Sequence, residues 1–113
     1  MTEGGYLYIL SSKGKRLYTG VTSQLMQRVA QHKKKLHPDS FTARYNIDSL
    51  VYFEAFGSIS QAIARESAIK NLPRIDKIRL IVALNPTWRD LSEDWNKPTP
   101  PFDPAKLRTP STF

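Results

Sequence analysis

The hydrophobic pattern near the N-terminus alternates with a period of two residues. A short aromatic and branched run, from Tyr6 to Leu10, is followed by the turn-forming residues 11–15, and a second short run stops at Gly20. This pattern predicts a β-hairpin with strands near 5–11 and 16–20. Because side chains alternate between the faces of a strand, Tyr6 and Tyr8 share one face and Leu7 and Ile9 the other. With the aliphatic face as core, the tyrosine face would be available to a ligand.

The apolar period then changes to that of a helix. Leu25, Met26 and Val29 recur at helical spacing, which predicts a helix over residues 23–35, and we expect Thr22 to cap its start. Arg28 and His32 lie one turn apart on a neighbouring face of that helix. Residues 36–47 have no clear period and contain a proline, so the sequence predicts a loop there.

The remaining apolar segments predict one strand and two helices. Residues 49–56 are aromatic and branched and predict the third strand. Ser58 and Gln61 form a capping box for a helix over 59–71, and Pro73 is suited to the start of another over 73–84. The predicted fold class is therefore α/β in the α+β sense, a small three-stranded antiparallel sheet flanked by three helices.

Composition changes after residue 85. Six of the eight prolines lie in residues 86–113. We therefore expect one domain over residues 1–85, followed over 86–113 by a proline-rich strap and tail. The strap, up to residue 95, would dock through Trp88, Leu91 and Trp95, and the remainder would be mobile.

Charge indicates the class of partner. The chain carries +7, and the whole excess falls in residues 1–85, which hold 13 basic against 6 acidic residues. Such a field attracts polyanions and favours nucleic acid, with simple solubility as the alternative explanation. The chain has no cysteine, so a metal would be held by oxygen or nitrogen, as a hard ion such as Mg²⁺ prefers. No apolar run is long enough for a membrane span and no signal segment is evident, so we expect a cytoplasmic protein without a membrane partner.

An ordered set of residues resembles one known family. Leu7-Tyr8-Ile9 follows Gly5, Tyr18-Thr19-Gly20 comes ten residues later, and Arg28, His32 and Glu66 follow on predicted helices. Over roughly residues 4–84 the chain resembles the GIY-YIG endonuclease family, in particular its small single-domain bacterial members. The sequence departs from the family pattern at Val21, where several members have lysine. It also has no asparagine about a dozen residues beyond Glu66, since Asn71 is too early and Asn85 rather late.

The resemblance implies a metal-dependent endonuclease that hydrolyses DNA phosphodiester bonds, with a structure-specific or repair-linked role. It implies that one motif tyrosine activates water. We favour Tyr18 for this task, with Tyr8 as an orienting group. Tyrosine ordinarily has a pKa of about 10, so a nearby cation must stabilise its phenolate. It further implies that Arg28 binds phosphate, that His32 relays a proton or binds phosphate, and that Glu66 holds Mg²⁺ or Mn²⁺.

Each of these residues also has a structural explanation. The two tyrosines could be half-buried strand residues, Arg28 and His32 ordinary helix-surface residues, and Glu66 an ion-pair partner of Lys70 at i+4. Because no second carboxylate lies near Glu66 in the sequence, a two-metal mechanism is disfavoured.

Four basic residues are candidate nucleic-acid contacts: Lys33, Lys34, Lys35 and Arg44. Lysines at the end of a helix also complement its dipole, and Tyr45 beside Arg44 could be a loop anchor instead of a base contact. DNA is favoured over RNA. The competing function is a catalytically silent nucleic-acid-binding module with the same fold. A protein partner for the proline-rich tail ranks below both, and we expect a monomer or weak dimer.

Overall fold

The computed structural model describes residues 4–93 and 95. Three strands and four helices follow one another along the chain: β1 (Gly5–Ser11), β2 (Leu17–Thr22), α1 (Leu25–Lys33), α2 (Phe41–Arg44), β3 (Ser49–Phe56), α3 (Ile59–Lys70) and α4 (Arg74–Leu84). The strands form one antiparallel sheet in the order β2-β1-β3, with β1 in the centre. The predicted α+β fold class, with a three-stranded sheet and three longer helices, is confirmed.

The segment between α1 and β3 differs from the prediction. The helix α1 ends at Lys33, two residues early, and Lys35 adopts a left-handed conformation (φ 51°) that turns the chain back. Within the predicted loop, α2 forms one helical turn, because the Ser40 hydroxyl accepts a hydrogen bond from Ala43 N at 3.2 Å. A helix of four residues is too short to produce a hydrophobic period, so the sequence pattern predicted a loop.

The expected cap of α1 was also wrong. Strand β2 continues past Gly20 to Thr22, and the helix begins only at Leu25, with Gln24 at the cap position. Thr22 Oγ1 instead accepts a hydrogen bond from Gln24 N at 3.0 Å. Its hydroxyl therefore shapes the turn between β2 and α1, and it does not satisfy a helical amide.

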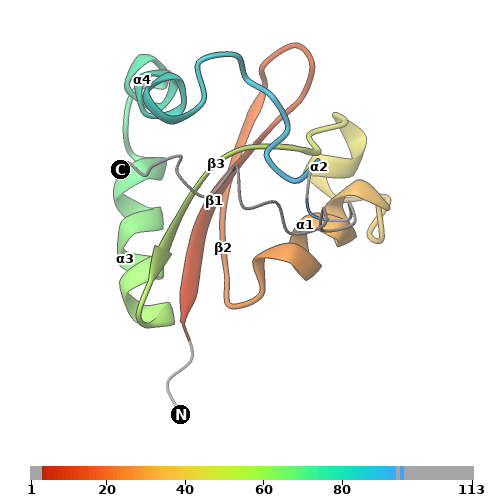
Figure 1. Cartoon of the computed structure of the whole chain (residues 1–113). Coiled ribbons are helices and arrows are strands. Elements are labelled where there is room, and N and C mark those ends of the chain that lie inside the picture. The colour runs from red at the N-terminus through yellow and green to blue at the C-terminus, as the bar shows by residue number, and fades with distance from the viewer. Residues whose placement is uncertain (1–3, 94, 96–113) are drawn as a thin grey trace, which may run out of the picture.

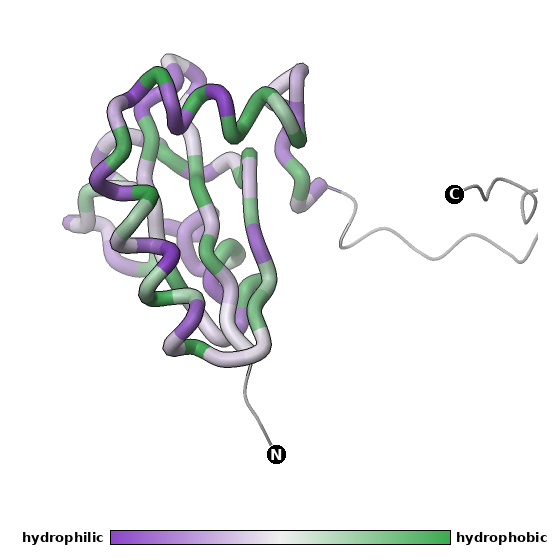
Figure 2. Tube along the Cα trace, turned by 90° about the vertical axis from the view of Figure 1, so that its left-hand side faces the viewer, coloured by the Kyte–Doolittle hydropathy of each residue, from purple (hydrophilic) through white to green (hydrophobic). Residues whose placement is uncertain are grey.

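The sheet is covered on both faces. Figure 1 shows α3 and α4 on one side of the strands and α1 and α2 on the other. Against α3 and α4 packs a cluster of buried residues: Leu7, Ile9, Val51, Tyr52, Ile69 and Ile81. Against α1 packs a second cluster: Tyr8, Leu10, Leu25, Val29, Ile47 and Leu50. Figure 2 shows the matching pattern, with hydrophobic segments along the strands and alternating hydropathy along the helices.

This two-sided burial corrects the expected role of the tyrosine face. Tyr8 is only 1% exposed, because its face of β1 is covered by α1. Tyr6, near the start of β1, is partly buried and packs against the same cluster. The central position of β1 thus makes both of its faces interior, and Tyr8 is not open to a ligand along the face of its ring.

The chain beyond α4 returns across the sheet. Trp88 packs against the cluster on the α3 and α4 side, whereas Leu91 and Trp95 pack against the cluster on the α1 side. Leu91 N donates to Leu50 O at 2.7 Å. The expected mobile tail over 96–113 lies outside the described residues, and the domain boundary at residue 85 stays a prediction. Within the described part, no helix has both the length and the apolar character needed to cross a bilayer.

Candidate active site

Three aromatic rings from three elements meet beside the sheet. The ring centroids of Tyr8 on β1 and Tyr18 on β2 lie 6.3 Å apart, and the His32 ring on α1 lies 5.9 Å from the first and 5.6 Å from the second. Their mutual tilts are between 48° and 58°, which are favourable arrangements for aromatic pairs. The structure therefore brings together three of the five residues that the sequence analysis proposed as catalytic.

Gly20 makes room for this cluster. It lies directly opposite Tyr8 in the pairing of β1 with β2. A Cβ atom added at Gly20 would stand 2.6 Å from the Tyr8 Oη and Cζ atoms and 3.0 Å from the Tyr18 ring. The absence of a side chain thus leaves room for the hydroxyl end of Tyr8 beside β2, where it reaches His32 on α1. The reason for this glycine is space, since its φ is not positive.

His32 links the sheet to α2 through both ring nitrogens. Its Nε2 lies 3.0 Å from Tyr8 Oη, and its Nδ1 lies 3.0 Å from Thr42 Oγ1. The hydrogen-bonded network continues to Ser40 Oγ, which lies 3.3 Å from Thr42 Oγ1. Each hydroxyl can donate or accept, so the hydrogen bonds can reverse together when the imidazole changes tautomer. This network fixes the orientation of the ring and is able to pass a proton along it.

The environment keeps both His32 and Tyr8 neutral at pH 7. Burial, assisted by the charges of Arg28 and His37, lowers the pKa of His32 to about 4. Burial raises the pKa of Tyr8 to about 12, against the opposing effect of its hydrogen bond with Arg28. A neutral imidazole can accept a proton, whereas it contributes no charge to phosphate binding.

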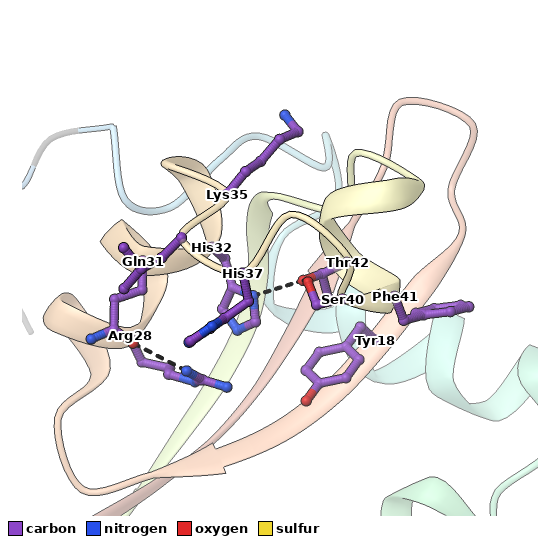
Figure 3. A pocket seen from close by; sticks show the side chains of 10 residues that line it. Tyr18, Arg28, Gln31, His32, Lys35, His37, Ser40, Phe41 and Thr42 are labelled. Atoms are coloured by element: carbon purple, nitrogen blue, oxygen red, sulfur yellow. Dashed lines mark hydrogen bonds between the residues drawn. The ribbon is translucent and has the colours of Figure 1, made fainter.

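A cavity of about 230 Å³ opens beside His32. Its walls come from β2, α1, α2 and the segment between the two helices: Tyr18, Arg28, Gln31, His32, Lys35, Leu36, His37, Ser40, Phe41 and Thr42. Figure 3 shows the Tyr18 hydroxyl and the Arg28 guanidinium pointing toward the same space. Arg28 Nη1 donates to Gln31 Oε1 at 3.0 Å, which restrains the guanidinium there. The cavity therefore combines a phenol, an imidazole and a cation of the kind that binds phosphate.

Glu66 approaches the cluster from α3. Its negative charge is one of the influences that raise the pKa of Tyr8, although it does not line the cavity. Its side chain is 16% exposed, and its Oε2 pairs with Lys70 Nζ at 3.1 Å, as its i+4 spacing allows. The carboxylate is thus near the aromatic cluster and already compensated by one cation.

Comparison with known proteins identifies the family of this chain. A family model described as the GIY-YIG catalytic domain matches residues 4–78. The chain belongs to the GIY-YIG family. A UPF0213 protein from Natronomonas pharaonis is 38% identical over 81 residues, which cover 72% of this chain and 94% of that protein. A UPF0213 protein from Clostridium perfringens is 40% identical over 76 residues, or 67% of this chain and 81% of the relative.

A solved structure extends the likeness to the fold. The solution NMR structure of a UPF0213 protein from Bacillus halodurans matches with a TM-score of 0.51 and 26% sequence identity, covering 82% of this chain and 97% of that one. Membership of the GIY-YIG family indicates a nuclease-type domain, while the names of these relatives state no reaction.

The GIY-YIG family uses divalent metals, and the donor set here can be tested against that chemistry. Within the described part of the chain, no group of three or more His, Asp or Glu side chains is gathered at one point. Mg²⁺ commonly binds one or two carboxylates and keeps several waters, taking its other oxygens from a substrate phosphate. One carboxylate at Glu66, whose charge reaches Tyr8, fits such a site when substrate supplies the remaining oxygens.

The four candidate nucleic-acid contacts differ in their surroundings, because Lys33 is paired with other residues of the chain and the other three are exposed. Lys33 Nζ donates to Asp90 and, at 2.9 Å, to Asp48 O, so its ammonium ties α1 to the residues beside β3. Lys34 and Lys35 are exposed, and Lys35 also lines the cavity. Arg44 is exposed on α2 with its guanidinium 6.0 Å from the Tyr45 ring centroid. The assignment of all four to nucleic acid stays a prediction.

Sequence reasoning missed the residues that hold the site in place. Thr42 and Ser40 orient His32, and Gln31 restrains Arg28. The spacing of Ser40 and Ala43 could have suggested a capped turn, but no pattern links Thr42 to a histidine ten residues earlier. The late Asn85 has a structural role: its Nδ2 donates to Val51 O at 3.2 Å and to Arg89 O at 2.8 Å.

Proposed function

We propose that this protein is a metal-dependent endonuclease that hydrolyses phosphodiester bonds in DNA. The observation that carries the proposal is the meeting of Tyr18 and His32 at a cavity that also contains Arg28, with the buried Tyr8 ring packed against both aromatic rings. Phosphodiester hydrolysis needs a base for water and positive charge at the phosphate as negative charge develops. Both requirements are met by groups that face the same space.

Each residue then has a distinct task. Tyr18, which lines the cavity together with Arg28, takes a proton from the attacking water, whose oxygen forms a bond to phosphorus. Arg28 holds two phosphate oxygens with its planar fork while the bond to the leaving deoxyribose oxygen breaks. The leaving oxygen gains a proton from solvent. Tyr8 is a positioning residue, because its hydroxyl is occupied by His32 and its pKa of about 12 keeps it protonated.

His32 is a positioning residue as well, because its neutral ring holds the Tyr8 hydroxyl through Nε2 and the Thr42 hydroxyl through Nδ1. Its pKa of about 4 disfavours the phosphate-binding role that the sequence analysis left open, since only the charged ring attracts phosphate. Glu66 would hold Mg²⁺ or Mn²⁺. A metal ion bound there would supply Lewis-acid stabilisation of charge on the phosphate.

The partner is DNA in this proposal, in preference to RNA. The basic excess of residues 1–85 supports a polyanionic substrate, and it would accelerate encounter at low salt. We further propose a structure-specific or repair-linked role, a monomeric or weakly dimeric state and a cytoplasmic location. These finer statements require a substrate panel, sedimentation and cell fractionation, respectively.

The experiment that tests the proposal is incubation with single-stranded, duplex, flap and branched DNA in Mg²⁺, Mn²⁺ or EDTA. We expect cleavage with either metal and none in EDTA. The Arg28→Lys variant should lose cleavage while retaining its positive charge, because an ammonium does not reproduce the fork. Binding without cleavage on every substrate would support the alternative function, a catalytically silent nucleic-acid-binding module.

A further inference from the structure

An exposed aromatic residue stands at the edge of the candidate active site. Phe41, the first residue of α2, is 47% exposed and lines the same cavity as Tyr18 and Arg28. Figure 3 shows its ring beyond Tyr18, pointing away from His32. The ring is therefore excluded from the hydrogen-bonded cluster, although it belongs to the wall of the cavity. Its exposure leaves a large apolar surface beside the phosphate-binding group.

The neighbouring aromatic residue supports Phe41 from behind. The ring centroids of Phe41 and Tyr45 lie 5.0 Å apart, and the Arg16 guanidinium of the β1–β2 turn lies 4.3 Å from the Tyr45 ring centroid. These contacts tie α2 to the hairpin, so Tyr45 is an anchor, as the sequence analysis considered. The tilted Tyr45 ring packs against Phe41 and limits its rotation, which reduces the entropy lost when a ligand binds to the ring.

Cations at the cavity and around the neighbouring Tyr45 complement a nucleic-acid strand. Arg28 and Lys35 line the cavity, and Arg16 and Arg44 lie around Tyr45. An aromatic platform within a positively charged track is the arrangement by which proteins bind single strands, since phosphates contact the cations and bases stack on the rings. A membrane or an acidic peptide would not require a rigid ring next to a phosphodiester site.

We propose that Phe41 stacks on an unpaired base next to the phosphate that is bound at Arg28. Bases within a duplex already stack on their neighbours, so a side chain reaches a base face only where the strand is single or the base is displaced. The substrate class is accordingly DNA with unpaired nucleotides at the cleavage point. This inference rests on the proposed function, because it assigns the preferred DNA structure to the same site.

Binding in EDTA tests the inference without cleavage. The affinities of wild type, Phe41→Ala, Phe41→Leu and Phe41→Trp are measured for a single-stranded oligonucleotide and for a blunt duplex that contains it. The expected result is a loss of about tenfold in single-strand affinity for the Ala and Leu variants, retention in the Trp variant, and duplex affinity within about twofold of wild type. The leucine variant keeps apolar volume but lacks an aromatic face, so it separates stacking from burial.

A matched control comes from the opposite side of the sheet. Ile63 on α3 is 48% exposed, close to the value for Phe41, and Ile63→Ala should leave both affinities unchanged. Equal losses for single strand and duplex, or no loss in the Leu variant, would overturn the proposal. Melting temperatures establish that each variant is folded, and the Leu and Trp variants decide the question where the Ala variant is unstable.

The outcome is separable from that of the proposed function. Cleavage by wild type together with unchanged single-strand affinity in Phe41→Leu would overturn the stacking proposal and leave the nuclease intact. Single-strand binding that depends on Phe41, without cleavage of any substrate, would support stacking while excluding the nuclease. The affinity for single-stranded RNA of the same sequence is measured as well. Tighter binding of the RNA than of the DNA would overturn the assignment to DNA.

Discussion

The two faces of the sheet use the same strands for different purposes. On the side of α3 and α4, the buried residues are mainly aliphatic, with Ile69 and Ile81 packed on Leu7 and Ile9. On the side of α1 and α2, alternate residues of the same central strand include Tyr8, which packs among apolar residues but ends in a hydrogen bond with His32. One face therefore gains stability mainly from aliphatic burial, with only Tyr52 of its cluster donating to a carboxylate, Glu54, while the other face must satisfy polar groups that join three elements.

The difference shows how a small domain can hold a polar candidate site beside an aliphatic core. The aliphatic face fixes the position of β1, and this places Tyr8 opposite Gly20 with little freedom. The polar face then needs few contacts of its own to orient a histidine. Of the described buried side chains, none has a polar atom without a hydrogen-bond partner, so the polar cluster is fully satisfied. Five experiments distinguish the contributions of the two faces.

The largest expected effect is a loss of cleavage when Glu66 is changed. Glu66 belongs to α3, yet its charge influences Tyr8 on the opposite side of the sheet. Glu66→Gln should reduce Mg²⁺-dependent cleavage by orders of magnitude, because the amide keeps the shape but loses the charge that favours the metal. DNA affinity should persist or rise slightly, and the fold should lose only the Lys70 pair, about 0.2–0.5 kcal/mol.

The control for that variant is Asp76→Asn on α4, which removes an exposed carboxylate that pairs with Arg79. Cleavage, affinity and melting temperature are measured for both variants under one set of conditions. Full-rate cleavage by Glu66→Gln would exclude the metal-binding role. Equal losses in both variants would point to a general electrostatic effect.

Truncation on the aliphatic face should give the largest loss of stability. Ile69 is fully buried against the sheet, so Ile69→Ala should lower the free energy of unfolding by about 2–5 kcal/mol. Urea denaturation measures this loss, with the exposed Ile63→Ala variant as the control. A loss below about 1 kcal/mol would show that this face is not the main source of stability.

On the polar face, the corresponding change removes one hydroxyl. Thr42→Val keeps the shape of the side chain but leaves His32 Nδ1 without its partner at 3.0 Å. The cost should be about 1–3 kcal/mol, because a partly buried polar atom loses its hydrogen bond. NMR of the imidazole should also show a changed tautomer population. An unchanged spectrum would mean that Thr42 does not orient the ring.

The pH dependence of stability should identify His32. Its pKa is about 4 in the folded protein against an ordinary value of 6.5, so the unfolded chain takes up the proton first as the pH falls. Stability is therefore complete above pH 6.5 and declines from there toward pH 4, by at most about 1.4 kcal/mol per pH unit and less with solvent screening.

His32→Gln should flatten that decline between pH 6.5 and about 5 in thermal denaturation. At lower pH the carboxylates of Glu54 and Asp90 contribute as well. Hydrogen bonds from Arg65 and from Lys33, respectively, depress their pKa values against the effect of burial, and their stabilisation is lost as they become protonated. An identical pH profile in the variant would contradict the burial of a neutral His32.

The smallest effects are expected at the lysines that end α1. Lys33→Ala should cost about 0–1 kcal/mol of stability, because it breaks the partly exposed pair with Asp90. The double variant Lys34→Ala, Lys35→Ala should instead weaken binding to all DNA sequences alike and reduce the salt slope by about two. If the single variant reduces the salt slope by as much as the double variant, Lys33 also contacts phosphate.

The local patterns of the sequence determined most of the elements and the set of candidate residues. Period-two and helical spacings located the three strands and the three longer helices to within a few residues. The order of Tyr8, Tyr18, Arg28, His32 and Glu66 was sufficient to indicate the family before any contact was known. These features follow from interactions between near neighbours in the chain, which a linear pattern records.

Only the tertiary structure decided which of those residues meet. The burial of Tyr8, the bond between His32 and Thr42 and the pairing of Lys33 with Asp90 join separate elements, and the last of these spans 57 residues. Such contacts depend on the order of strands in the sheet and on which helix covers which face. Hydrophobic periodicity is the same for either face, so packing alone assigned α1 to Tyr8 and placed Phe41 beside the cavity.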